Sequence, residues 1–164
     1  MFQNRFLRYS ENFYQIFIQL GSNLQSLLLL YLRVTWGHQF AIDGLLKLQK
    51  IEATIATFTT LQISHPWISA HLAGWVELIF GFCIFIGFGS RFVALPLISL
   101  MFNALKISKG PDVPALNLLL DPMLLVKEPP YPFLLAAVII FCFGPGRISI
   151  DAWLKRWAEK KPRF

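Results

Sequence analysis

Four apolar stretches run along the chain, and short polar or charged segments separate them. They cover residues 24–48, 68–89, 92–107 and 128–143. A helix needs about 20 apolar residues to cross a bilayer and at least about 17, so the first two are long enough and the last two are near the limit. Pro129 and Pro130 suit the first turn of the last stretch, where a missing N–H is harmless. The pattern predicts four membrane-spanning helices.

Both ends of the chain carry another pattern, in which apolar positions recur at steps of three and four. Near the N-terminus these positions are Phe2, Phe6, Tyr9, Phe13, Ile16 and Leu20. Near the C-terminus they are Ile150, Trp153, Leu154 and Trp157. Helices of this kind lie in a membrane interface. Whether these tails only anchor the protein or also dock a partner stays open, with anchoring favoured.

We therefore expect an all-α protein: an integral membrane four-helix bundle with amphipathic interfacial helices at both termini. The bundle would cover residues 24–146, the N-terminal segment 1–23 and the basic C-terminal helix 147–164. Composition agrees, since 55% of the 164 residues are hydrophobic and only 15% are charged, against about 25% charged in soluble domains. A soluble protein with a buried helical core is the alternative, and four apolar runs in so short a chain argue against it.

Basic residues are distributed unevenly about the four stretches. An even number of spans puts both termini on one side, which then holds nine basic residues against five on the other. The nine are Arg5, Arg8, Arg91, Arg147, Lys155, Arg156, Lys160, Lys161 and Arg163; the five are Lys47, Lys50, Lys106, Lys109 and Lys127. The positive-inside rule predicts cytoplasmic termini, in a bacterial-type inner membrane whose anionic lipid attracts the basic ends. Because these residues flank the apolar stretches, nucleic-acid binding is disfavoured.

Ionisable residues inside the apolar stretches are the main candidates for function. A charge near the bilayer centre costs about 2.5–3.5 kcal/mol on insertion scales, so it needs a partner inside the protein. Arg33 and Glu77 fall at depths that differ by about 8 Å at 1.5 Å per residue, and we predict that they form an ion pair. Asp43 and Lys47 can pair at i,i+4. Helical periodicity groups several of these residues into one polar stripe: Arg33, Lys47, Glu77, Ser99, Asn103 and Lys106.

Two interpretations of the stripe stay open. In one, the Arg33–Glu77 pair only fixes the register of two helices. In the other, which intramembrane charge favours, the stripe lines a binding site for a polar head such as a quinone carbonyl or a small anion. The sequence shows no metal-ligand spacing, phosphate loop or nucleophile–base pair, so we expect no metal, no intrinsic cofactor and no autonomous catalysis. The apolar segment 110–128 is expected to fold onto the bundle, as a lid or a plug.

Several motifs resemble those of the DoxX family of small four-span membrane proteins. The strongest is Gly144-Pro-Gly-Arg-Ile-Ser-Ile-Asp-Ala-Trp-Leu154, which resembles that family's GPGR-x-S-x-D-xx-L signature. Arg33 and Lys47, and Glu77 with Gly81, resemble further family segments, so the likeness covers about residues 25–155. We interpret five residues of the signature as an exit turn and helix cap: Gly144, Gly146, Arg147, Ser149 and Asp151. The glycines permit the turn, while the serine and aspartate cap the helix that follows.

The resemblance implies a redox setting, because some members are linked to thiosulfate:quinone oxidoreductase complexes and others to oxidative-stress membrane complexes. A quinone is then the implied cofactor, with Arg33, Glu77 and Asn103 at its head. No electron carrier is recognisable in the sequence, so such a role needs a soluble or membrane partner subunit; a homo-oligomer also stays open. Two other functions remain: a carrier for a small lipid-soluble or anionic molecule, and a structural anchor that recruits soluble enzymes.

Overall fold

The computed structural model describes residues 2–109 and 122–159, and in this part of the chain all regular structure is helical. The helices are α1 (Phe2–Gln49), α2 (Ile51–Thr60), α3 (Pro66–Ile86), α4 (Ser90–Lys109), α6 (Pro122–Val126), α7 (Pro130–Phe143) and α8 (Ile150–Glu159). The prediction of an all-α fold is confirmed for these residues. Helices occur at all four apolar stretches, and the bounds of α3, α4 and α7 differ from the expected ones by a few residues at most.

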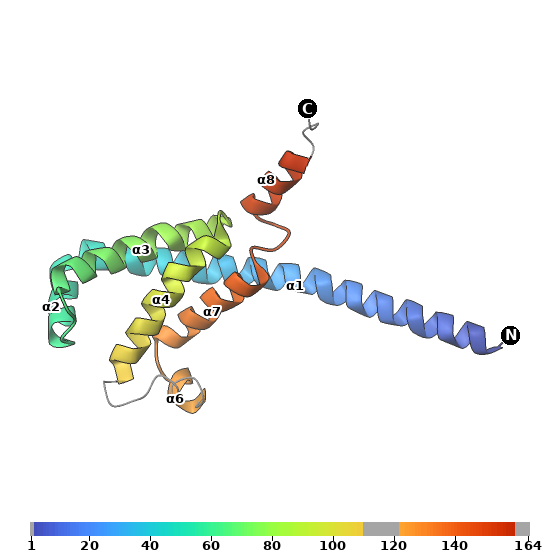
Figure 1. Cartoon of the computed structure of the whole chain (residues 1–164), viewed down its shortest axis with the longest axis horizontal. Coiled ribbons are helices and arrows are strands. Elements are labelled where there is room, and N and C mark those ends of the chain that lie inside the picture. The colour runs from blue at the N-terminus through green and yellow to red at the C-terminus, as the bar shows by residue number, and fades with distance from the viewer. Residues whose placement is uncertain (1, 110–121, 160–164) are drawn as a thin grey trace.

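Helix α1 is much longer than the sequence pattern suggests. It runs without a break through 48 residues, about 72 Å at 1.5 Å per residue. The expected N-terminal segment 1–23 and the first apolar stretch are therefore one rod rather than two elements. The C-terminal half of the rod packs in the bundle, and its N-terminal half extends away from the other helices (Figure 1).

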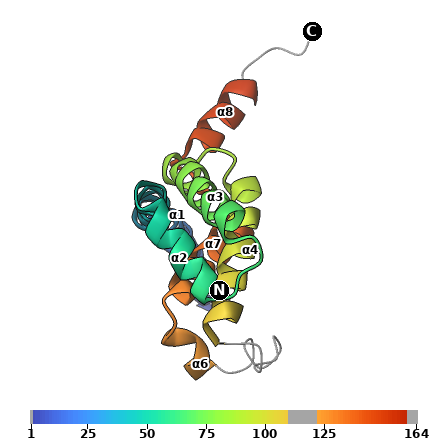
Figure 2. The ribbon, with the colours of Figure 1, turned by 90° about the vertical axis from the view of Figure 1, so that its left-hand side faces the viewer.

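The bundle is built on the close antiparallel packing of α1 against α3, with α4 packed on α7 and α7 also touching α1 (Figures 1 and 2). Glycine makes the first contact possible. A Cβ atom at Gly37 would lie 2.6 Å from the backbone nitrogen of Phe85, and one at Gly44 would overlap the backbone nitrogen of Leu78. In a membrane, where the lipid is as apolar as the helices, small residues at such positions let two helix backbones approach closely.

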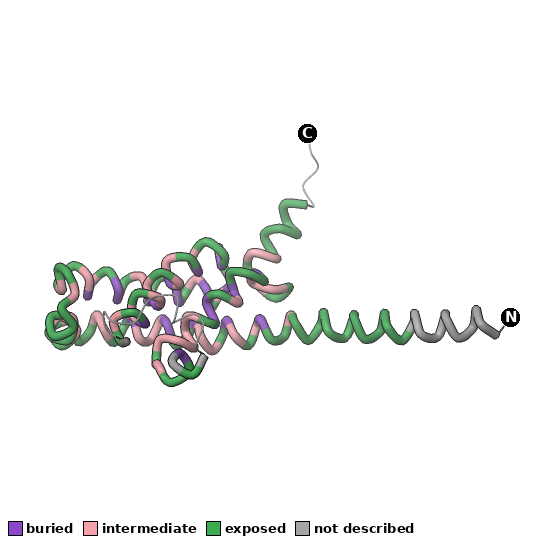
Figure 3. Tube along the Cα trace, turned by 60° about the horizontal axis from the view of Figure 1, so that its bottom comes forward, coloured by how far each residue is buried: buried purple, intermediate pink, exposed green. Residues whose placement is uncertain are grey.

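The core lies where α1, α3, α4 and α7 meet, and the outer surface is also apolar. Buried core residues include Phe40, Ile84, Leu97 and Ile140, while large side chains such as Phe92 are exposed. Figure 3 shows how buried and exposed positions alternate along the helices. Within the described ranges, two helices are long and apolar enough to cross a membrane, Pro66–Ile86 and Ser90–Ser108, and α7 is a shorter apolar helix.

Two short helices fill segments where the sequence predicted none. Helix α2 continues the chain after Lys50 and packs on α3. Helix α6 falls within segment 110–128, where a lid or plug was expected. Residues 110–121 lie outside the described part, so the structure bears on that expectation only from residue 122 onward. Leu125 of α6 is buried against Leu105 and partly buried side chains of α7, which places α6 against the ends of α4 and α7.

Candidate functional site

A buried ion pair joins the two most closely packed helices. Glu77 of α3 is 1% exposed, and both of its carboxylate oxygens accept hydrogen bonds from the Lys47 ammonium group, in the last turn of α1. Gly44, one turn before the lysine, lets the α1 backbone lie directly against Leu78, next to the glutamate. The ammonium group remains partly exposed, whereas the carboxylate is enclosed.

The predicted Arg33–Glu77 pair is wrong, and the reason is the register between α1 and α3. The sequence places Arg33 and Glu77 at depths that differ by about 8 Å, but α1 continues well past the end of α3, and Arg33 lies level with that end. Gly37 faces Phe85 and Gly44 faces Leu78, so Arg33 and the glutamate lie about 18 Å apart along the helix axis at 1.5 Å per residue. The predicted Asp43–Lys47 pair is wrong too: the lysine bonds Glu77, and the aspartate accepts a hydrogen bond from Gln39 at 3.0 Å.

Arg33 is buried at the other end of the bundle, in contact with the C-terminal motif. Its side chain is 1% exposed, and Nη2 donates a hydrogen bond to the Ile148 carbonyl. Gly87, which ends α3 with a φ of +75°, lies against the guanidinium, and a Cβ atom there would overlap Nη1. Asp151 is close enough for its charge to act on that of the arginine. Nε and Nη1 have no hydrogen-bond partner among the described residues.

The motif that follows α7 closes the bundle by binding the turn between α3 and α4. The Asp151 carboxylate accepts hydrogen bonds from the backbone nitrogens of Gly89 at 2.8 Å and Ser90 at 3.1 Å. It therefore caps α4, whereas the sequence interpretation assigns it to the helix that follows the motif. Ser149 caps that helix, since its Oγ accepts a hydrogen bond from the Ala152 nitrogen at 3.0 Å.

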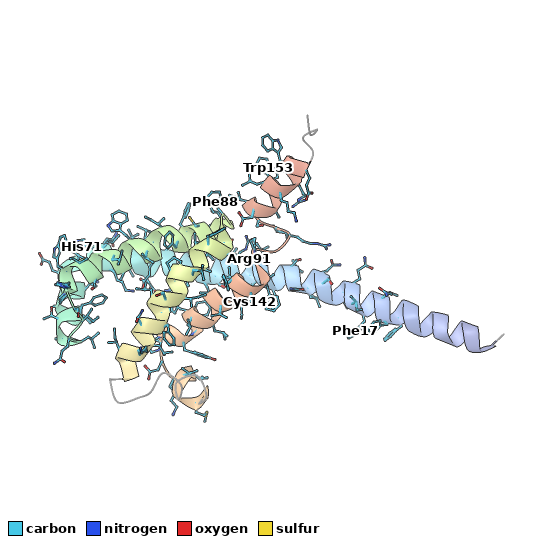
Figure 4. The ribbon with its side chains drawn as sticks, viewed as in Figure 1. Phe17, His71, Phe88, Arg91, Cys142 and Trp153 are labelled. Carbon is cyan, nitrogen blue, oxygen red and sulfur yellow. The ribbon has the colours of Figure 1, made fainter. Side chains whose placement is uncertain are left out.

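The remaining motif residues shape the chain between α7 and α8. Gly144 and Gly146 have φ angles of +77° and +76°, in the left-handed region that favours glycine. Arg147 reaches back to α1, where Nη1 donates to the Asn23 side-chain oxygen at 3.2 Å. Nearby, the Arg91 guanidinium lies 3.5 Å from the Cys142 carbonyl at the same end of the bundle (Figure 4).

The polar positions of α4 do not join the predicted stripe. Ser99, Asn103 and Lys106 are all exposed, because α4 buries its opposite face, including Leu97 and Leu105. The asparagine side chain donates to the Ser99 carbonyl at 2.8 Å within the same helix, and the Lys106 ammonium group lies over the Phe102 ring. Of the six stripe residues, the structure brings together only Lys47 and Glu77.

A cavity of about 230 Å³ borders the Lys47–Glu77 pair. Helices α1, α2, α3, α4 and the start of α7 all contribute to its walls, which are otherwise apolar and aromatic. Its lining includes Phe40, Asp43, Phe58, Met101 and Phe133, beside the ion pair. A second cavity of about 390 Å³ lies between α2, α3 and α4. The two share Phe58, Ala73, Leu100 and Ala104, so they adjoin.

Sequence reasoning missed Phe58 entirely and left Asp43 out of the site. The aromatic residue lies on α2, in a segment where no helix was expected, because apolar residues there are mixed with Glu52 and several threonines. The sequence interpretation pairs the aspartate with the lysine of its own helix instead of placing it at the site.

Chemically, the arrangement can hold a molecule that has a polar head and an apolar body. Lys47 offers hydrogen-bond donors beside a buried carboxylate, and three phenylalanine rings form apolar walls. In the described part of the chain, no group of three His, Cys, Asp or Glu side chains is placed to hold a metal ion.

Comparison with family models finds one match, DoxX, over residues 28–109. That range covers α1 from its centre, α2, α3 and α4, and it includes Arg33, Lys47 and Glu77. No curated protein and no solved structure matches the chain.

Proposed function

Because the chain belongs to the DoxX family, we propose that it is a four-span membrane protein that binds a quinone head beside Lys47 and Glu77. It would act as a non-autonomous subunit of a redox complex related to sulfur compounds or oxidative stress, and a partner subunit would supply the electron carrier. Helices α1, α3, α4 and α7 would span a bacterial-type inner membrane. Two described helices are long and apolar enough to cross a membrane, and this observation supports a membrane protein, as does the family.

The orientation proposed for the bundle puts both termini in the cytoplasm. Basic side chains gather at the end where the α3–α4 turn, the exit from α7 and α8 meet. They include Arg91, Arg147 and Arg156, and the last of these donates to the Arg147 carbonyl at 2.9 Å. Such a cluster at one end supports the cytoplasmic assignment by the positive-inside rule. The exposed apolar face of α8, with Trp153 and Trp157, would lie in the lipid interface there.

The observation that carries the binding proposal is the Lys47–Glu77 pair, with its buried carboxylate, at the wall of a cavity lined by aromatic side chains. An ion pair that only fixes helix register needs no adjoining space, and here a cavity of about 230 Å³ opens beside it. With the neighbouring cavity of about 390 Å³, the space falls within the range of about 300–1,000 Å³ for small-molecule sites. A polar head would lie by the lysine, and an apolar tail would follow the second cavity past Phe58.

Five of the lining residues have a defined role in this proposal. The Lys47 ammonium group would donate a hydrogen bond to a carbonyl oxygen, and Glu77 would hold or pass on a proton at its carboxylate. Phe40, Phe58 and Phe133 would pack on the ring and exclude water. A bound quinone would supply two-electron chemistry that no side chain offers. Arg33 is too far from this cavity to take part, and Asn103 lines only the second one.

The direct test is retention of quinone by the full-length protein, purified gently in lipid nanodiscs. Short-chain ubiquinone and menaquinone analogues are added, and the bound fraction is measured by solvent extraction and mass spectrometry. Glu77→Gln keeps the volume of the side chain while removing its charge, and Lys47→Met removes the donor. We expect each change to weaken retention about tenfold, the effect of one lost charge-assisted hydrogen bond.

Two matched controls remove a charge of the same sign at exposed sites: Glu52→Gln on α2 and Lys106→Gln on α4. They should retain quinone as the unchanged protein does. Equal retention by all four variants, or no saturable retention by the unchanged protein, would refute the proposal.

A structural anchor for soluble enzymes is the second candidate, favoured by the exposed basic side chains of α8, Lys155 and Arg156. This function predicts loss of partner recovery when residues 147–164 are deleted, with no bound small molecule. A carrier is distinguished from both by transport of its cargo into vesicles, which Glu77→Gln would abolish.

A further inference from the structure

Residues 13–31 of α1 have no partner among the described residues along the helix face that carries most of their exposed large apolar side chains. Arg33 lies beside Gly87, which directly follows α3. Residues before Arg33 therefore extend beyond the end of α3, and Phe13 lies about 30 Å further along the rod at 1.5 Å per residue. Residues 13–25 are all exposed, and Figure 3 shows this stretch of α1 in green.

A membrane that covers α3 does not cover this half of the rod. The 21 residues of α3 span about 32 Å, which matches the hydrocarbon core of about 30 Å. If α3 crosses the membrane, the hydrocarbon core ends near the level of Arg33. Because α1 is a continuous helix, residues 13–31 then stand in water or in the polar headgroups. Their apolar face needs another cover.

That apolar face has the spacing of a coiled-coil seam. Six side chains follow one another at steps of 4, 3, 4, 3 and 4, and each exposes 54–70% of its surface: Phe13, Phe17, Leu20, Leu24, Leu27 and Tyr31. Alternating steps of three and four form the a and d positions of a heptad. The positions between them are mostly polar on the opposite side, including Gln15, Gln19, Ser22 and Ser26. Residues 12–32 contain no charge that would oppose pairing.

We propose that this seam pairs with the same seam of a second copy, so that the protein is a homodimer joined by a parallel coiled coil over residues 13–31. Two copies inserted with the same orientation present their α1 helices in parallel, as a symmetric seam requires. At 100° per residue, Arg33 lies about 160° from the centre of the seam. The two bundles therefore lie on outer sides of the coiled coil and do not collide.

The area is sufficient for a specific dimer. Taking roughly 200 Å² for a large side chain, within the range for aromatic residues, six side chains exposed by more than half offer about 700 Å² per copy. Two copies would then bury about 1,200–1,400 Å², at the lower end of stable protein interfaces. The inference rests on the proposed membrane placement of α3, and it does not depend on quinone binding.

Disulfide cross-linking along the rod tests the proposal. In a Cys83→Ala/Cys142→Ala background, single cysteines are placed in full-length protein reconstituted in liposomes: Phe17→Cys, Leu20→Cys and Leu24→Cys on the seam, and Gln19→Cys, Ser22→Cys and Ser26→Cys as matched controls on the polar face. We expect a cross-linked dimer at the seam positions and at most about one-tenth as much at the controls, because a and d side chains face each other in a parallel dimer. Uniform cross-linking, or a maximum on the polar face, would overturn the proposal.

A second measurement does not depend on cysteine chemistry. Leu20→Glu with Leu24→Glu puts two charges into the seam of each copy, and Gln19→Glu with Ser22→Glu puts the same charges on the polar face. Single-molecule photobleaching in liposomes should show dimers for the unchanged protein and the control, and monomers for the seam variant. We expect its dissociation constant to rise at least about 100-fold. If the unchanged protein is monomeric, the coiled coil is refuted. Quenching of residues 13–31 by lipid-phase probes in such a monomer would show that lipid covers the seam instead. Neither result would change quinone retention.

Discussion

The two buried charged sites on α1 differ in what surrounds them. Arg33 is enclosed by backbone: the Ile148 carbonyl accepts its hydrogen bond, and Gly87 lies directly against it. At the other site only the Glu77 carboxylate is enclosed, the Lys47 side chain is partly exposed, and a cavity adjoins the pair. Both sites bury a charge where burial is costly, but only the second leaves space for another molecule. Intramembrane charge alone therefore does not identify a binding site, and the space beside it does.

The largest expected effect comes from breaking the ion pair on one side. Lys47→Leu leaves the Glu77 carboxylate buried without its partner, which costs about 3–5 kcal/mol of folding free energy. The double variant Lys47→Leu/Glu77→Leu should recover most of that loss, because no buried charge remains. Denaturant unfolding in mixed micelles measures both.

A control double-mutant cycle for that prediction combines Arg33→Leu with Glu77→Leu, two residues that form no ion pair in the structure. These residues lie about 18 Å apart along the axis at 1.5 Å per residue, so their effects should add within about 0.5 kcal/mol. Strong coupling in this second cycle, with none in the first, would reverse the assignment of partners.

The next effect tests whether Arg33 is held by the turn that follows α3. Gly87→Ala should cost about 3 kcal/mol or more, because a methyl group at a left-handed φ costs about 1–2 kcal/mol and here it also displaces the guanidinium. Gly89→Ala is the control: its φ is +57°, and its Cβ would meet nothing within 4 Å. Gly89→Ala should therefore cost only about 1–2 kcal/mol, the penalty of a methyl group at a left-handed φ. Equal losses for the two variants would show that the arginine contact contributes nothing.

A smaller effect is expected where the C-terminal motif caps α4. Asp151→Ala removes two hydrogen bonds to the Gly89 and Ser90 nitrogens and a negative charge at a helix N-terminus, worth about 0.5–2 kcal/mol. Limited proteolysis should then cleave more rapidly between α7 and α8. Glu159→Gln, at the exposed end of α8, is the control. If this control variant is cleaved as rapidly as Asp151→Ala, the capping role is contradicted.

The smallest effect concerns the outer face of α4. Ser99→Ala should change the unfolding free energy by less than about 0.5 kcal/mol, since the side chain is exposed. Quinone retention should not change either. A marked loss in either measurement would restore the serine to the site and weaken the contrast between the two ends of α1.

Much of the helix pattern follows from local sequence. Apolar runs with proline at the start and glycine after the end predict α3 and α7, and the apolar run alone predicts α4, which contains Pro96. Local sequence suffices here because helix formation and capping depend on residues within a few positions of each other. Helix α2 and the continuity of α1 across residues 23 and 24 escaped this reasoning. The polar residues before Leu24 suggested a separate interfacial segment, although nothing in the sequence breaks the helix there.

The sequence by itself determined the all-α class, the apolar helices, the family and the burial of charge at positions 33 and 77. Only the tertiary structure decided the partner of each charge. Glu77 pairs 30 positions away, and Arg33 bonds a carbonyl 115 positions away. Such contacts depend on the register between helices, which is set where Gly37 and Gly44 meet the α3 backbone. A shift of one helical turn moves a side chain by about 5.4 Å, farther than an ion pair can span, and periodicity within one helix holds no information about that shift.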